Sequence, residues 1–128
     1  PLDTLGANHF FVAATLGSNA EPVYITAEAN QLKFFNKDRT LRFKKGFDYP
    51  ISHRPQLLEL PNGEMKIGVV CASANRIYLI DFNGELHTGF PLEGNNEFTI
   101  LPTVQGQNGQ FNVFVTNANG QFCNYLID

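Results

Sequence analysis

Short apolar runs separated by polar turns recur along the chain, and their pattern returns after an offset of 45 residues. Equivalent positions around one turn are apolar in all three copies: Tyr24, Val69 and Phe114; Ile25, Val70 and Val115; Leu32, Ile77 and Phe122; Phe35, Ile80 and Tyr125. The runs are rich in β-branched and aromatic residues and are bounded by Gly, Asn and Pro. This composition predicts short strands rather than helices.

Each copy predicts a set of antiparallel strands. The predicted strands are 9–16, 23–28, 31–36 and 39–44; then 56–60, 66–72, 76–82 and 85–88; then 97–101, 111–117 and 121–127. The third copy therefore lacks an outer strand of its own. The dipeptides Asn83-Gly84 and Asn119-Gly120 predict type I′ hairpin turns, which need positive φ at both positions.

A four-stranded antiparallel unit that repeats every 40–45 residues or so has the period of a β-propeller blade. We therefore predict an all-β, propeller-type fold of about three blades, at residues 9–45, 56–89 and 97–128 of one domain that spans 1–128. One small sheet cannot bury both of its faces alone, so the blades are expected to stack. The run from Ile67 to Ala72 is apolar without alternation, as expected of a strand covered on both faces.

The stretch RIYLIDFNGELHTGFPLEG, residues 76–94, resembles the repeat of quinoprotein-like and related bacterial envelope propellers. The matching residues are Ile77, Tyr78, Leu79, Asp81, Gly84 and Leu86. The resemblance implies a WD40-like, extracytoplasmic β-propeller, periplasmic or extracellular, and no bound cofactor, because no cofactor-site residue can be carried over. In those repeats a Trp side chain usually packs between neighbouring blades. This chain has none, and Phe47 and Phe90, each after a Gly, are expected to take its place.

About three blades are too few to close a ring, since closed propellers have roughly four to eight. We therefore expect a homo-oligomer, in which two chains complete one ring, or a larger propeller of which this chain is a part. The start at Pro1 rather than Met favours a piece of a longer protein. Residues 1–6 resemble an outer strand, and we expect them to fill the missing position in a partner.

Composition and charge narrow the function. With 43% hydrophobic residues the chain is not disordered, and it has no apolar stretch of about 20 residues that could span a membrane. A net charge of −3 argues against nucleic-acid binding. Six of the nine Lys and Arg residues lie between positions 33 and 45, where charges on an outer strand discourage edge-to-edge pairing. Cys71 and Cys123 fall in different predicted blades, too far apart for a disulfide.

No catalytic or metal-binding motif is present. The sequence therefore predicts a non-catalytic binding or scaffold module, with protein, peptide or glycan as the partner. The alternative is a fragment of a propeller enzyme, either glycan-active or quinone-dependent, because such enzymes draw their catalytic residues from many blades.

One rim of the predicted propeller is rich in amides. Loops between blades and the turns between second and third strands meet there, and their polar side chains suit a peptide or glycan. The alternative is a set of ordinary solvated turns. The candidate residues are Asn30, Gln31, His53, Arg54, Asn75, Arg76, Asn96 and Glu97, with Asn8, His9, Asn95 and Gln121 beside them.

Overall fold

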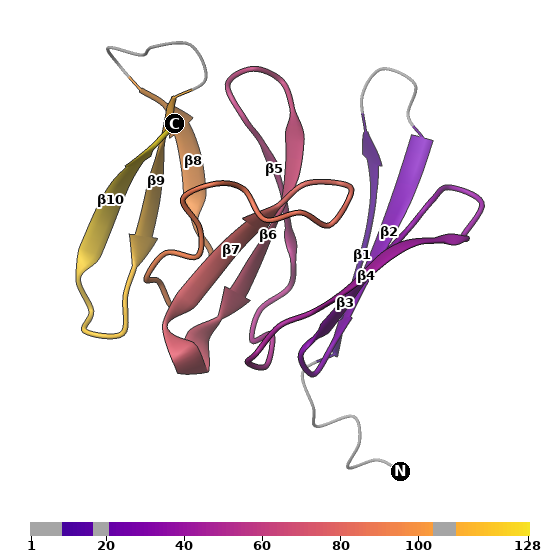
Figure 1. Cartoon of the computed structure of the whole chain (residues 1–128), viewed down its shortest axis with the longest axis horizontal. Helices are drawn as coiled ribbons and strands as arrows, with labels where there is room; N and C mark the ends of the chain where they lie inside the picture. The colour runs from indigo at the N-terminus through magenta and orange to yellow at the C-terminus, as the bar shows by residue number, and fades with distance from the viewer. Residues whose placement is uncertain (1–8, 17–20, 104–109) are drawn as a thin grey trace.

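The computed structural model describes residues 9–16, 21–103 and 110–128, which form three antiparallel sheets lying side by side (Figure 1). The first sheet has the order β1 (His9–Leu16), β2 (Glu21–Glu28), β3 (Gln31–Phe35), β4 (Leu41–Gly46). The central sheet consists of β5 (Gln56–Glu59), β6 (Met65–Cys71) and β7 (Arg76–Ile80). The third sheet consists of β8 (Thr99–Pro102), β9 (Phe111–Thr116) and β10 (Phe122–Ile127).

The prediction of an all-β chain with antiparallel sheets is confirmed. In the described part of the chain the only helical element is a single 3-10 turn, η2 (Ala72–Ala74). Residues 1–6, predicted as an outer strand, lie outside the described residues, as does Asn8.

The predicted strand at residues 85–88 is wrong. The segment that follows β7 pairs with the edge of β7 only at two isolated bridges, Ile80 with Leu86 and Ile77 with Leu92. Gly89 interrupts the segment with a φ of 99°, and Pro91 lacks the N–H that a continuous ladder needs. The central sheet therefore has three strands where four were predicted, whereas the first sheet has all four.

The central sheet is buried on both faces, as the non-alternating run had indicated. On β6, Ile67 and Val69 pack against the first sheet, and Val70 packs against the third. Between them Gly68 leaves room for the Phe98 ring: a Cβ at Gly68 would lie 2.8 Å from Phe98 Cζ. Two interfaces between neighbouring sheets, here called seams, thus contain the buried core. Burying each large apolar side chain there stabilises the fold by about 1.5–3 kcal/mol.

Phe47 and Phe90 occupy the two seams between sheets, as predicted. Phe47 is 6% exposed between the first and central sheets, and its ring centroid lies 4.8 Å from that of Tyr78. Phe90 is 7% exposed between the central and third sheets, 6.4 Å from Phe98. Each ring enters its seam from the segment that connects one sheet to the next.

Four hairpin turns share one backbone geometry, which corrects the prediction of type I′ turns. In each, the first residue donates its N–H to the fifth residue's carbonyl and accepts from the fourth residue's N–H; the turns are residues 36–40, 60–64, 81–85 and 117–121. Positive φ occurs at the fourth residue, Gly84 or Gly120, and not at Asn83 or Asn119. These are three-residue loops closed by one left-handed residue.

Side chains 45 residues apart point to the same side of their sheets in all three units only in the third strand of each unit. Leu32 and Ile77 each point toward the following sheet, and Phe122 points the same way, away from the central sheet. In the second strand Val70 faces the third sheet, but Val115 faces back toward the central one. The connections to the third strand have two, four and five residues, and the odd number reverses the facing.

Candidate functional site

The predicted rim exists as a meeting place of loops and turns. Ile51 donates its N–H to the Ala29 carbonyl at 2.8 Å, and Ser52 donates its N–H to the Val70 carbonyl at 2.9 Å. Asn30 donates from Nδ2 to the Phe47 carbonyl at 2.7 Å. The segment between the first two sheets is thus bonded both to the turn before it and to the strand after it.

A matching set of bonds forms at the second seam. Gly94 donates to the Asn75 carbonyl at 3.3 Å, and Asn95 donates to the Thr116 carbonyl at 2.9 Å. Asn75 Oδ1 accepts the N–H of Ala118, at 2.9 Å, from the third sheet. Asn30 and Asn75, which are 45 residues apart, therefore both hold neighbouring segments together.

Two more predicted site residues also make structural contacts. Arg54 Nη1 donates to the Phe11 carbonyl on β1 at 2.6 Å, which ties the loop before β5 to the first sheet. Arg76 Nη1 donates to the carbonyls of Ala74 and Asn75 at 3.3 and 3.1 Å. Both guanidinium groups are thus hydrogen-bonded to main-chain carbonyls.

Within the described part of the chain, the side chains of His53 and Asn96 bond only to adjacent residues. The His53 ring contacts Ser52 Oγ at 2.8 Å, and Asn96 Oδ1 accepts the N–H of Glu97 at 2.8 Å. The side chains of Gln31 and Glu97 are exposed and make no hydrogen bond or ion pair within the described residues. They are therefore the predicted site residues most available to a ligand.

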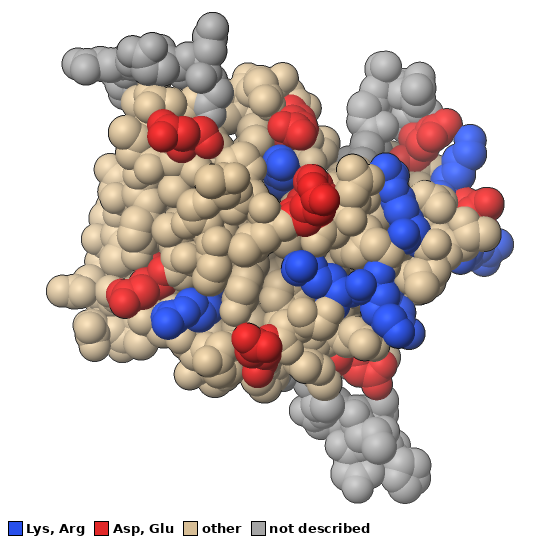
Figure 2. Space-filling model, in the orientation of Figure 1, with Lys and Arg blue, Asp and Glu red and all other residues tan. Residues whose placement is uncertain are grey.

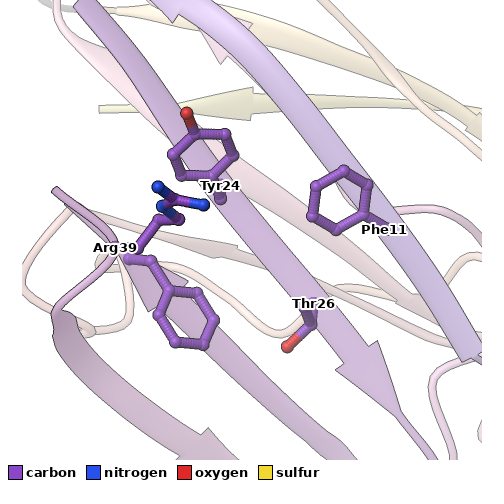
Figure 3. Close-up of a pocket in the computed structure, with 5 residues that line it drawn as sticks. Phe11, Tyr24, Thr26 and Arg39 are labelled. Carbon is purple, nitrogen blue, oxygen red and sulfur yellow. The ribbon is translucent and has the colours of Figure 1, made fainter. Parts of the chain in front are cut away.

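A hollow of about 370 Å³ lies on the outer face of the first sheet, which sequence reasoning had missed (Figure 3). Phe11, Tyr24, Thr26, Phe35 and Arg39 line it. Cross-strand pairing puts the aromatic rings on one face, since Tyr24 lies opposite Phe35 and Phe11 opposite Thr26. The Phe11 and Tyr24 rings are stacked at 6.3 Å.

Arg39 enters this hollow from a left-handed backbone. Its φ of 72° falls at the turn position where the three matching turns have Gly63, Gly84 and Gly120. A non-glycine residue there costs about 1–2 kcal/mol. In the sequence, Arg39 looked like one of several solvated charges. Alignment of residues 36–40 with the glycine-containing turns is the signal that could have singled it out.

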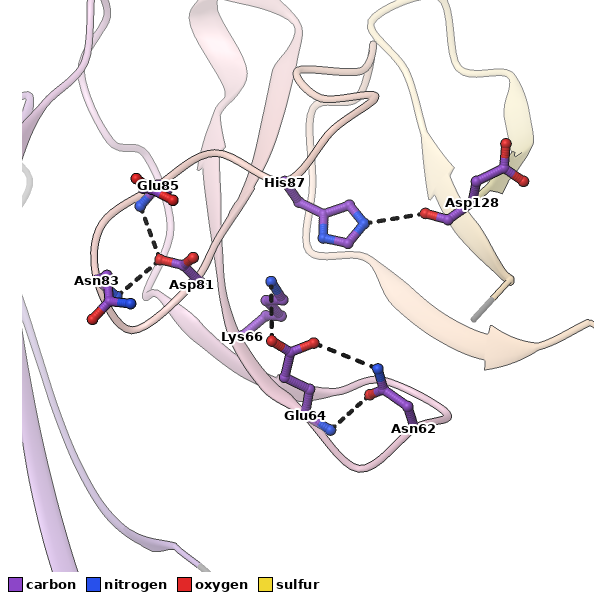
Figure 4. Close-up of polar contacts among 8 residues, drawn as sticks. All are labelled: Asn62, Glu64, Lys66, Asp81, Asn83, Glu85, His87 and Asp128. Carbon is purple, nitrogen blue, oxygen red and sulfur yellow. Dashed lines mark hydrogen bonds and ion pairs between the residues drawn. The ribbon is translucent and has the colours of Figure 1, made fainter. Parts of the chain in front are cut away.

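Charged and polar side chains lie along the central sheet and its turns, and one of them, His87, reaches the end of the third sheet (Figure 4). Lys66 is only 6% exposed, with Nζ 3.7 Å from Glu64 Oε2. His87 Nε2 lies 3.4 Å from the Asp128 carbonyl, a contact between the two sheets. The sequence did not indicate that Lys66 is buried, because lysine at the start of an apolar strand is ordinarily exposed.

Asp81 closes the turn beside Lys66. Its Oδ1 accepts the N–H groups of Asn83 and Glu85 at 2.8 and 2.9 Å. Burial acts to raise the pKa of Asp81, but these hydrogen bonds and nearby Lys66 outweigh it and hold the pKa below the ordinary 3.8. The cluster thus stabilises a turn and a seam.

Both cysteines are free, as expected from their placement in different sheets. Burial raises the pKa of Cys71 to about 11, so its thiol stays protonated at neutral pH. Among residues 9–16, 21–103 and 110–128, no three His, Cys, Asp or Glu side chains converge as a metal site would require. Over the same ranges, no helix has the length and apolar character to cross a bilayer.

No protein-family model matches this chain, and no curated protein matches it as a relative. Function must therefore be inferred from the chain's own residues and contacts.

Proposed function

We propose that the chain is a non-catalytic binding or scaffold module of a β-propeller, either part of a larger one or self-associating. The observation that carries this proposal is that successive sheets are joined twice in the same way. Ser52 and Asn95, each in a connecting segment, donate their N–H groups at 2.9 Å to the second strand of the following sheet. Repeated interfaces between like units are how repeat folds build one continuous core.

Contacts among the first strands support a blade-like stack. Arg54, just before β5, bonds to Phe11 on β1. Gln56 on β5 both donates to the Phe98 carbonyl at 2.9 Å and accepts the Phe98 N–H at 3.0 Å, just before β8. Strands β1, β5 and β8 are thus linked in series, as innermost strands of neighbouring blades would be. The resemblance of residues 76–94 to quinoprotein-like propellers supports this proposal through β7 and the turn at Gly84, but not through the outer strand, which does not form.

The rim is the surface we propose for a peptide or glycan. Asn30 and Asn75 are held by bonds to neighbouring segments, so they form a rigid support. Gln31 and Glu97 project from it with exposed amide and carboxylate groups, which suit the hydroxyls of a sugar or the amides of a peptide. Donors and acceptors held on a rigid support recognise such ligands at little entropic cost.

The test is a peptide and glycan array probed with the wild-type chain, a Gln31→Ala/Glu97→Ala variant and an Asn83→Ala/Glu85→Ala control. The control residues are exposed on the turn at residues 81–85, away from the rim. We expect the rim variant to bind at least about tenfold more weakly, the equivalent of one good hydrogen bond, and the control to match wild type. An array without signal, or equal binding by both variants, would overturn the proposed rim.

A further inference from the structure

The outer face of the third sheet has the character of an interface. Strand pairing puts eight uncharged residues on it: Thr99, Leu101, Asn112, Phe114, Thr116, Phe122, Asn124 and Leu126. Phe122 is 72% exposed, Leu126 57% and Leu101 47%. The polar groups are turned to each other, since Asn112 Nδ2 donates to Asn124 Oδ1 at 2.9 Å. An uncharged patch with exposed aromatic and aliphatic groups is typical of the centre of a protein contact.

Positions equivalent to Phe122 are buried elsewhere in the molecule. Leu32 and Ile77 precede it by 90 and 45 residues, face in the same sense and are completely buried against the following sheet. Phe122 instead stacks on Phe114, with ring centroids 5.8 Å apart, and has no following sheet over it in the described part of the chain. Within the described residues, the face of the third sheet that corresponds to these two seams therefore has no sheet packed on it.

The first sheet offers the other half of such a seam. Its outer face carries Phe35, the equivalent of Ile80, and Ile80 is completely buried against the preceding sheet. Phe11, 54% exposed, shares this face. Lys33 and Lys44 also lie on it, and their long side chains can cover apolar surface and keep their ammonium groups in water. Glu28 and Gln31 lie at the end of this face that borders the rim.

Charge makes the two ends complementary. Residues 9–46 contain six Lys and Arg against three Asp and Glu, whereas residues 97–128 contain Glu97 and Asp128 and no Lys or Arg. Most Lys and Arg side chains in view in Figure 2 lie over the first sheet. Opposite net charges favour the approach of the third sheet of one molecule to the first sheet of another over the approach of like ends.

We propose that the outer face of the third sheet docks on the outer face of the first sheet of a second copy, head to tail. The inference rests on the proposed function, because it treats the three sheets as units of one repeat. Phe122 then fills the seam beside Phe35 and Phe11 of the neighbouring copy. In such a contact each molecule uses two different surfaces, so it closes into a ring or continues as a chain.

Sedimentation equilibrium of the full chain tests the contact. We expect wild type to have a mass of at least twice 14.3 kDa at micromolar concentration. Phe122→Lys and Phe11→Lys should each sediment as single chains, with an apparent dissociation constant raised at least about 100-fold. Tyr49→Lys, at a 44% exposed tyrosine outside both faces, is the matched control and should behave as wild type. A single-chain mass for wild type would overturn the proposal.

Mixing the two lysine variants separates head-to-tail pairing from pairing of like faces. A Phe122→Lys chain keeps its first sheet and a Phe11→Lys chain keeps its third, so an equimolar mixture can form one intact seam and should sediment as a pair. Dissociation by Phe122→Lys alone, with Phe11→Lys still associated, would overturn the pairing. Loss of association with array binding intact would reject this inference alone; loss of array binding with association intact would reject only the rim.

Discussion

The central and third sheets are built from similar strands but meet different surroundings. On β6 every residue from Lys66 to Cys71 is buried, whereas along β10 exposed and half-buried residues alternate until Ile127. Both strands are mostly apolar, yet β6 has a sheet on each side and β10 has one. The comparison shows that apolar content alone does not decide burial: β6 is covered on both faces, whereas the outer face of β10 has no sheet over it within the described chain.

The largest expected contrast is between Ile77 and Phe122, which stand 45 residues apart at equivalent positions. Ile77→Ala should lower the free energy of unfolding by about 2–5 kcal/mol, because it leaves a cavity in a closed seam. Phe122→Ala should change it by less than about 1 kcal/mol. Urea denaturation at a dilution where the chain is monomeric measures both. Equal losses would mean that the outer face of the third sheet is already covered within one chain.

Glycine substitutions sharpen the same contrast. Gly68→Ala should destabilise by about 1–3 kcal/mol, because its Cβ would lie 2.8 Å from both Leu58 Cδ1 and Phe98 Cζ. Gly46→Ala, at the end of β4, is the matched control, since nothing lies within 4 Å of its added Cβ. Thermal unfolding of the two variants should show a lower Tm for Gly68→Ala alone. A neutral Gly68→Ala would indicate that the second seam is loosely packed.

The first sheet differs from the other two in one hairpin turn, where Arg39 takes the left-handed position that glycine takes in the matching turns. Arg39→Gly removes the side chain from a left-handed backbone and should raise stability by up to about 1 kcal/mol. The reverse change, Gly63→Arg in the matching turn, should lower stability by about 1–2 kcal/mol. Denaturant midpoints measure both. Loss of stability in Arg39→Gly would show that the guanidinium contributes more in the hollow than its backbone costs.

The smallest effect concerns pH. The pKa of Asp81 is lower in the fold than its ordinary 3.8, so its contribution to stability is present above that value and is lost as pH falls through the folded pKa. Asp81→Asn, which copies Asn117 in the matching turn, keeps an acceptor but cannot titrate. We therefore expect wild type to lose more stability than the variant between pH 5 and 2, measured by urea unfolding at each pH. Parallel pH profiles would contradict this role.

Much of the strand structure could be predicted because its signals are local. Apolar runs between Gly, Asn and Pro located ten strands to within two residues of their ends; β4, for example, starts and ends two residues later than predicted. The strand predicted at 85–88 is reduced to one bridge at Leu86, because the chain turns after His87 and Gly89 takes a positive φ, so the pairing cannot extend into a ladder. The seams also place Phe47 and Phe90 as predicted.

The candidate surfaces were harder to predict because they combine distant segments. The hollow on the first sheet joins Phe11, Tyr24, Phe35 and Arg39 from four different parts of the chain. The loops and turns assigned to the rim do make contacts with one another, but sequence alone could not show that the Asn30 side chain is hydrogen-bonded while that of Gln31 has no partner within the described residues. Such distinctions depend on which backbone group comes within 3 Å or so of a side chain.

Periodicity by itself determined that this chain forms small antiparallel sheets with apolar faces, because side-chain alternation and turn chemistry act over a few neighbouring residues. Only the tertiary structure decided which of those faces are covered. Whether a connection between strands has four residues or five reverses the facing of a whole strand, and that choice turns Val115 inward while leaving Phe122 exposed.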